Sequence, residues 1–286
     1  DTFPAEQVSV SAPRVQDRQA QGVTGDGGRL ERYAAEVTVT VRSDRIATET
    51  PIALTYNRIA HVVMMATPAD LEDFALGFSL TEGLIGGVAD LLATRVIPRE
   101  AGIELAMTIT DDWFDRLSTQ RRNMAGRTGC GLCGAETIAQ ALRYPAPVGL
   151  ALRVSHAALQ NAIEHLGLHQ PLQGETGATH GAAWCSRTGE ILRVREDVGR
   201  HNALDKLIGS LFREGFDPAT GFVFVSSRAS YEMVYKTAAA GIELIMAVSA
   251  PTALAVEFAL RSGITLVGFA RSGRHNIYAY PERIAQ

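Results

Sequence analysis

The sequence predicts two domains, a small N-terminal α+β domain and a C-terminal three-layer α/β/α domain. Two observations lead to this fold class. In the first half, apolar and polar residues alternate with the period of two that half-buried strands show. In the second half, short apolar runs alternate with segments of helical spacing, which implies parallel strands joined by right-handed crossovers. We place the α+β domain at residues 33–119 and the α/β/α domain at residues 135–286.

The first 32 residues contain little to bury and are rich in Gln, Gly, Asp, Ser and Pro. We expect this segment, residues 1–32, to be a disordered tail. The pattern then changes, because Val37, Val39 and Val41 alternate with polar residues and predict the first strand.

The rest of the N-terminal domain should contain one helix and two pairs of strands. Thr67 as an N-cap and Pro68 at the first helical position predict a helix start, and Gly83 predicts its end. The predicted strands are residues 52–56, 59–66, 94–97 and 103–109.

Residues 120–134 form the least globular part of the sequence. The stretch from Ser118 contains Arg121, Arg122, Arg127 and four glycines, with almost nothing to bury. Because long loops of this kind are usually functional or disordered, we expect a mobile loop here. A short helix at residues 135–143 should follow it.

Strands and helices alternate through the C-terminal half. The predicted strands are residues 181–186, 191–195, 222–225, 244–248 and 264–269. The predicted helices are residues 199–213, 230–240 and 252–262.

Composition excludes several classes of protein. The 27 basic and 31 acidic side chains give a net charge of -4, whereas a dedicated nucleic-acid binder would be basic. The most apolar stretch, residues 237–260, is interrupted by Glu243, Pro251 and Glu257, so it lacks the roughly 20 apolar residues of a membrane span. Three cysteines cannot form a disulfide framework. We therefore expect a cytoplasmic protein with no membrane or nucleic-acid partner.

Two thiols stand three positions apart, at Cys130 and Cys133. Such a pair can hold half a metal site, cycle as a disulfide or carry a sulfur atom. A zinc deaminase would need a His-x-Glu sequence, and none occurs. The upstream arginines and the predicted helix start downstream both favour thiolates. Thiol chemistry is therefore the favoured interpretation, although a thioredoxin-like role remains open.

Two polar motifs could line a pocket. In residues 195–206, Asp197 can cap the following helix, and His201 and Asp205 share a face; a solvated helix start and a pocket wall are equally compatible with this pattern. Residues 268–276 follow an apolar strand, at the position where open α/β sheets bind ligands. There Arg271 and Arg274 could hold phosphate oxygens, or form an exposed basic turn. Cys185 is expected to be a buried apolar residue.

Taken together, these segments resemble the FdhD family of sulfurtransferases, over about residues 33–281. The segments that carry the resemblance are Gly129-Cys130-Gly131-Leu132-Cys133-Gly134, Thr176-Gly177-Ala178-Thr179-His180, residues 196–206, Ser226-Ser227-Arg228 and Phe269-Ala270-Arg271-Ser272-Gly273-Arg274.

The resemblance implies a sulfur carrier that activates formate dehydrogenase. It would accept sulfur from a cysteine desulfurase as a persulfide and pass it to the molybdenum cofactor, a bis(molybdopterin guanine dinucleotide). Cys130 would bear the persulfide, with Cys133 assisting by relaying or releasing the sulfur. The cofactor-binding residues, which could also hold guanine nucleotides, would be Phe269, Ala270, Arg271, Ser272, Gly273 and Arg274. The resemblance further implies a homodimer and a cytidine-deaminase-like C-terminal domain without the zinc signature.

Two other functions compete with sulfur transfer. One is a chaperone that binds the guanine dinucleotide cofactor but performs no chemistry. The other is a zinc-dependent, deaminase-like hydrolase. The sequence does not identify the dehydrogenase or the desulfurase.

Overall fold

The computed structural model describes residues 2–11, 36–122, 146–149 and 151–286. The chain divides into two compact units, residues 1–46 and 47–286. The first unit contains an antiparallel pair, β1 (Thr2–Ser11) with β2 (Glu36–Arg45). The segment expected to be a tail thus includes a strand, whose Val8 and Val10 are in register with Val39 and Val37 of β2. Residues 12–32 of that segment lie outside the described residues.

A four-stranded sheet begins the second unit, in the order β4-β3-β6-β5. Its strands are β3 (Thr50–Tyr56), β4 (Ile59–Ala66), β5 (Leu91–Arg99) and β6 (Gly102–Ile109). Helices α1 (Leu71–Thr81) and α2 (Asp111–Arg122) pack their apolar side chains on one face of this sheet. The four predicted strands and the first helix are present. Helix α2 was not predicted, and it extends past the boundary placed at residue 119.

The start of α1 differs from the prediction. Its N-cap is Asp70, not Thr67. The Thr67 backbone N–H donates to Asp197 Oδ2 at 3.0 Å, and its hydroxyl accepts the Val198 N–H. Thr67 therefore bonds to the distant end of a strand in the C-terminal half, which local sequence patterns do not reveal.

A six-stranded sheet forms the centre of the C-terminal half, in the order β13-β12-β11-β10-β8-β9. Its strands are β8 (His180–Ser186), β9 (Ile191–Asp197), β10 (Gly221–Val225), β11 (Leu244–Ala247), β12 (Thr265–Arg271) and β13 (Arg274–Ala279). Strands β10, β11 and β12 are parallel, as predicted, whereas β8, β9 and β13 join the sheet antiparallel.

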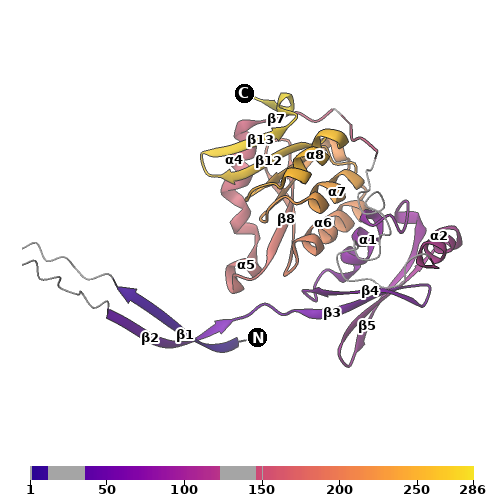
Figure 1. The fold of residues 1–286 in the computed structure, drawn as a ribbon, viewed down its shortest axis with the longest axis horizontal. Helices are drawn as coiled ribbons and strands as arrows, with labels where there is room; N and C mark the ends of the chain where they lie inside the picture. Colours follow the sequence, from indigo (N-terminus) through magenta and orange to yellow (C-terminus); the bar gives the residue numbers. More distant parts are fainter. Residues whose placement is uncertain (1, 12–35, 123–145, 150) are drawn as a thin grey trace, which may run out of the picture. The chain divides into compact units, whose positions relative to one another are not determined.

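Helices cover both faces of this sheet (Figure 1). On one face lie α6 (Arg200–Glu214), α7 (Tyr231–Ala239) and α8 (Ala253–Ser262), and on the other lies α4 (His156–His165). The predicted three-layer α/β/α arrangement is confirmed. The further cytidine-deaminase-like assignment stays a prediction.

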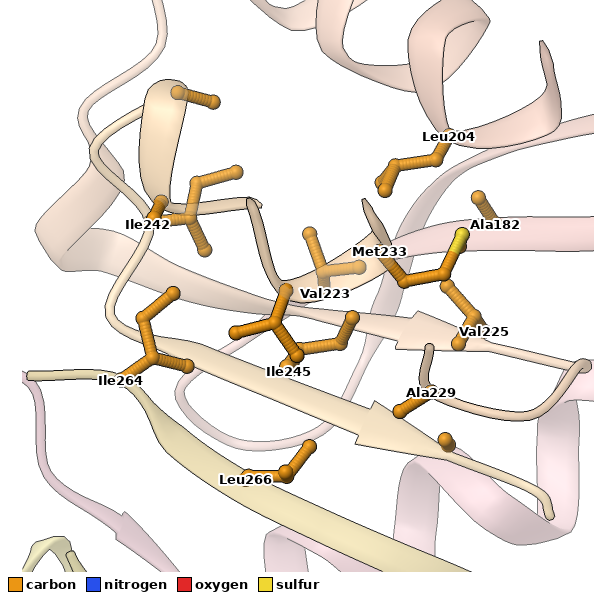
Figure 2. Close-up of a cluster of buried hydrophobic side chains, with 14 of the residues drawn as sticks. Ala182, Leu204, Val223, Val225, Ala229, Met233, Ile242, Ile245, Ile264 and Leu266 are labelled. Atoms are coloured by element: carbon orange, nitrogen blue, oxygen red, sulfur yellow. The ribbon is translucent and has the colours of Figure 1, made fainter. Parts of the chain in front are cut away.

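Alternation along the strands builds the two cores. In β10, Val223 and Val225 belong to the core under α6, α7 and α8, while Phe222 and Phe224 belong to the core under α4. Figure 2 shows the first core, where side chains of the sheet meet Leu204 of α6 and Met233 of α7.

The remaining elements are short. They are η1 (Val88–Asp90), β7 (Val154–Ser155), η2 (Leu166–His169), α5 (Pro171–Thr176), η3 (Pro218–Thr220), η4 (Pro281–Arg283) and β14 (Ile284–Ala285). Among the described residues, no helix combines the length and the apolar character needed to cross a bilayer.

Helices α1 and α6 cross at two glycines. A Cβ atom on Gly77 would lie 1.7 Å from the Asp205 carbonyl oxygen, and one on Gly209 would lie 1.9 Å from the Asp73 carbonyl oxygen. Only glycine allows two helix backbones to approach this closely. The crossing joins the four-stranded sheet to the C-terminal layers.

Buried ion pairs surround this crossing. Lys206 Nζ lies 2.6 Å from Asp197 Oδ2 with both side chains fully buried, and Lys236 Nζ lies 3.0 Å from Asp205 Oδ2. Lys206 also donates to the Thr67 carbonyl oxygen. Because a buried charge that loses its partner is strongly destabilising, these pairs fix the relative placement of β9, α6 and α7.

Candidate functional site

The carboxyl ends of the three parallel strands β10, β11 and β12 meet at one edge of the six-stranded sheet. The start of β8 and the end of β9 reach the same edge, because β8 pairs antiparallel with both β10 and β9. Helices α6, α7 and α8 follow β9, β10 and β11, so their N-termini begin here. Open α/β sheets bind their ligands at this edge, and helix N-termini favour anions.

A cavity of about 900 Å³ opens at this edge. Its volume is within the range of small-molecule sites. The strand side of its wall includes His180, Ser226, Val248, Ala270, Arg271 and Ser272. The opposite wall comes from α4, η2 and α5. The cavity therefore brings together three sequence motifs that are more than 40 residues apart.

The predicted basic turn is the hairpin between β12 and β13. Arg271 pairs with Arg274 across the strands, so Ser272 and Gly273 form the turn, with Gly273 at φ 77°. The Gly273 N–H donates to Gln160 Oε1 at 2.8 Å, which attaches the turn to α4. Both arginines are exposed. Their guanidinium groups can therefore reach a ligand at the mouth of the cavity.

Phe269 precedes this turn in a strained conformation. Its φ is 51°, in the left-handed region that bulky residues rarely adopt, and its side chain is 42% exposed. Its N–H donates to the Ser249 carbonyl oxygen at 3.1 Å, which holds the backbone in place. Three of the six predicted cofactor residues, Ala270, Arg271 and Ser272, line the cavity. The other three flank them in the chain.

The thiol motif is not visible in this arrangement. Cys130 and Cys133 lie outside the described residues, as does the helix predicted at residues 135–143. Cys185 is fully buried in β8 and belongs to the core under α4. Burial raises the pKa of its thiol, so it is a poor nucleophile. The interpretation of Cys185 as a buried apolar residue is confirmed.

The second polar motif is distributed over two environments. His201 Nε2 lies 2.8 Å from Glu232 Oε2 of α7, whereas Asp205 is buried against Lys236. These two residues therefore do not act together, although they share a helix.

Asp197 does not cap α6 as predicted, because the N-cap is Gly199. Its Oδ1 atom instead accepts the Gly199 N–H at 2.8 Å and the Asn202 side-chain amide at 3.0 Å. With Lys206 and Thr67 on its other oxygen, it joins α6 to the N-terminal sheet.

The far side of the cavity is shaped by residues of the polar motif and of the Thr176–His180 segment, for which the sequence predicted no individual role. Glu196 accepts hydrogen bonds from the Leu172 and Gln173 N–H groups and from the Thr179 hydroxyl. It thereby holds the start of α5 against the cavity rim. Thr179 and His180 were part of a motif that supported the family resemblance, and this was the only sign of their place at the cavity.

Two stacked imidazoles support the hairpin. His156 Nδ1 lies 2.8 Å from His275 Nε2, and Gln160 Nε2 lies 3.0 Å from His275 Nδ1. Burial, and to a smaller extent His156, lowers the pKa of His275 below its usual 6.5. The folded state therefore favours the neutral ring.

We predict that this pair makes stability depend on pH. Above pH 6.5 the His275 ring is neutral in the folded and the unfolded chain, and its contribution is fully present. As the pH falls from 6.5 toward the lower folded pKa, the unfolded chain takes up the proton first and the free energy of unfolding decreases. Urea unfolding between pH 7.5 and 5.5 should show a smaller decrease for H275Q than for the native chain. H169Q, at an exposed histidine, is the control, and equal slopes for H275Q and the native chain would contradict this account.

Comparison with known proteins identifies the family. The family model described as the FdhD/NarQ family matches residues 47–285. This chain belongs to the FdhD/NarQ family. The resemblance inferred from the sequence is confirmed.

Two relatives of this FdhD/NarQ chain are named sulfur carrier protein FdhD. The protein from Cupriavidus necator is 54% identical and covers 84% of each chain. The protein from Bordetella petrii is 51% identical over 91% of this chain and 93% of its own. A solved structure from Desulfotalea psychrophila, described as a candidate formate dehydrogenase accessory protein, has a TM-score of 0.66, 25% identity and 99% coverage of both chains.

The FdhD/NarQ match spans almost all of the second unit. It includes the four-stranded sheet, the glycine crossing, the cavity and the β12–β13 hairpin. It also includes Cys130 and Cys133.

Proposed function

We propose that this protein is a sulfur carrier for the maturation of formate dehydrogenase. It accepts a sulfane sulfur from a cysteine desulfurase on Cys130 and transfers it to the molybdenum cofactor, bis(molybdopterin guanine dinucleotide), which is its substrate. Membership in the FdhD/NarQ family, with close relatives named as sulfur carriers, is the observation that carries this proposal. The cavity at the carboxyl edge of the sheet supports it.

The proposed transfer uses two thiol exchanges. The Cys130 thiolate attacks the outer sulfur of the donor persulfide, the donor S–S bond breaks, and the donor leaves as a thiolate. Delivery then has two alternatives. Cys133 relays the sulfur, or its thiolate attacks the inner sulfur of the Cys130 persulfide and releases hydrosulfide with formation of a Cys130–Cys133 disulfide.

The carboxyl edge of the sheet has the chemistry that a guanine dinucleotide requires. Arg271 and Arg274 offer charged donors for pyrophosphate oxygens, and the turn between them offers backbone N–H groups. The exposed ring of Phe269 offers a planar apolar surface for a base. We therefore propose that Phe269–Arg274 holds a nucleotide end of the cofactor.

Mass spectrometry of the intact chain tests the sulfur-carrier function. Incubation with a cysteine desulfurase and cysteine should add the mass of sulfur atoms, and cyanide should remove them. Peptide mapping should place the label on Cys130. If a chain with both Cys130 and Cys133 replaced by alanine still activates formate dehydrogenase, the protein is a cofactor chaperone without sulfur chemistry.

The hairpin arginines give a separate prediction. R271Q/R274Q should bind guanosine diphosphate more weakly than the native chain by a factor of at least about 100, because each of the two charge-assisted contacts contributes roughly 1.5–3 kcal/mol. Isothermal titration calorimetry measures this change. R261Q is the matched control, because Arg261 is an exposed arginine in the last turn of α8, the turn farthest from the helix N-terminus. Unchanged affinity in R271Q/R274Q would remove the hairpin from the site.

The homodimer, the cytoplasmic location and the identities of the donor and acceptor enzymes stay predictions.

A further inference from the structure

A second cluster of cationic side chains lies where α6 and α7 begin. His201 Nε2 lies 2.8 Å from Glu232 Oε2, and this contact joins the first turns of the two helices. Arg200 immediately precedes His201, and Arg228 lies in the short loop between β10 and α7. Two arginines are thereby brought to one place by segments that are far apart in the sequence.

Neither arginine directly contacts a carboxylate of the described residues, although Glu232 lies near enough to act on the charge of Arg200. Within the part of the chain that the structure describes, neither Arg200 nor Arg228 has an ion pair or a side-chain hydrogen bond, and the buried Arg200 Nε has no acceptor. The nearby carboxylates are engaged elsewhere, Asp197 with Lys206 and Glu232 with His201. Burial lowers the pKa of Arg200 and the charge of Arg228 lowers it further, against an opposite effect of Glu232, so the two arginines lie near each other.

The helix starts at this cluster add backbone donors. Gly199 and Ser230 are the N-caps of α6 and α7. Gly199 has no side chain to cap its helix, and the Ser230 side chain makes no hydrogen bond to its helix. The Ser230 hydroxyl oxygen is buried without a partner among the described residues. First-turn N–H groups without a cap are oriented toward an incoming anion.

The cluster adjoins the cavity on the side away from the hairpin. His180, which lines the cavity, is in register with Asp197 near the start of α6. Ser226 lines the same cavity, exchanges hydrogen bonds with Gly181, and stands two residues before Arg228. Only β11 separates β10, which leads to Arg228, from β12, which leads to the hairpin, so these two strands lie about 10 Å apart in the sheet.

We propose that Arg200 and Arg228 form a second anion-binding site, which takes a phosphoryl or pyrophosphate group of the ligand whose other end the β12–β13 hairpin holds. The chemical class of the ligand is therefore one with two separated phosphoryl groups. The proposed function supplies only the identity of this ligand, a cofactor with two nucleotide arms. The anion site itself rests on the arrangement of side chains.

Calorimetric titration with inorganic pyrophosphate tests the second site on the full chain. The native chain should bind two pyrophosphates per chain. R200Q/R228Q should keep only the hairpin event, and R271Q/R274Q should keep only the event at Arg200 and Arg228. If R200Q proves to unfold the chain, R228Q alone provides the test, because Arg228 is exposed; its second event should weaken by about 10- to 100-fold. R261Q should behave as the native chain.

Two results would overturn the second site. One is an unchanged pyrophosphate stoichiometry and affinity in the folded R228Q chain. The other is the loss of all pyrophosphate binding in R271Q/R274Q. Sulfur loading of Cys130 is measured separately, so either failure can be distinguished from a failure of the proposed function. If Cys130 takes up sulfur but the chain binds only one pyrophosphate, only the second anion site is rejected. If the chain binds two pyrophosphates but Cys130 takes up no sulfur, only the sulfur-carrier function is rejected.

Discussion

Cys130→Ala is expected to abolish the cyanide-labile sulfur that the native chain gains from a cysteine desulfurase. Alanine offers no thiolate to attack the donor persulfide, and in the proposed transfer Cys133 receives sulfur only by way of Cys130. Activation of formate dehydrogenase should fall to the level without the protein. Cys133→Ala should block both delivery alternatives, because relay and hydrosulfide release each require the second thiol. A Cys130–Cys133 disulfide in the native chain after delivery would distinguish release from relay.

Cys185→Ala is the matched control for this experiment. Its thiol is fully buried, and burial raises its pKa, so its removal should leave sulfur loading unchanged. Undiminished label on Cys130→Ala would show that another residue carries the sulfur. Loss of label in Cys185→Ala, in a chain that remains folded, would place the chemistry in the core under α4 instead.

Among the proposed substitutions, we expect Gly77→Ala to lower the free energy of unfolding most. The added Cβ would lie 1.7 Å from the Asp205 carbonyl oxygen, and both helix backbones would have to separate. Overpacking of this kind costs about 3 kcal/mol, and the separation would also lengthen the buried hydrogen bond from the Thr81 hydroxyl of α1 to Asp205 Oδ1 of α6. Urea unfolding followed by circular dichroism measures the free energy of unfolding.

Gly174→Ala is the control for the crossing. Gly174 lies in helix α5, and an added Cβ there meets no atom within 4 Å. Because alanine is the better helix former, this change should be neutral or slightly stabilising. Equal stabilities of the two variants would mean that α1 can move away from α6 at little cost.

Local patterns predicted the elements well because strands and helices bury their apolar faces with fixed periods. Residues 222–225 and 244–248 stood out because both faces of the central strands are buried, which produces continuous apolar runs. The antiparallel strand β13 was not predicted. Its residues alternate only weakly in burial, and Arg274 and His275 give it the composition of a turn.

Contacts between distant segments account for the two wrong caps. Thr67 and Asp197 both have the residue types of helix caps, yet they bond to each other and to Lys206 across 130 residues of sequence. A propensity describes what a residue does when only its neighbours compete for it. Here Asp197 interacts with the buried Lys206 and with the distant Thr67 backbone more strongly than with the helix start beside it.

The candidate site was predictable on one side only. The Phe269–Arg274 turn follows an apolar strand, so its place at the sheet edge follows from topology. The wall formed by α4, η2 and α5 could not be predicted, because these helices touch the cavity through side chains such as Gln173, with no regular spacing.

Phe269 shows that this edge is not optimised for folding alone. An exposed aromatic ring on a left-handed backbone contributes little to the core and costs about 1–3 kcal/mol of strain. In the proposed complex, a base stacked on the ring would recover that energy as buried area. The strain is thus a fixed cost of the backbone, and contact with a ligand would offset it without a change of conformation.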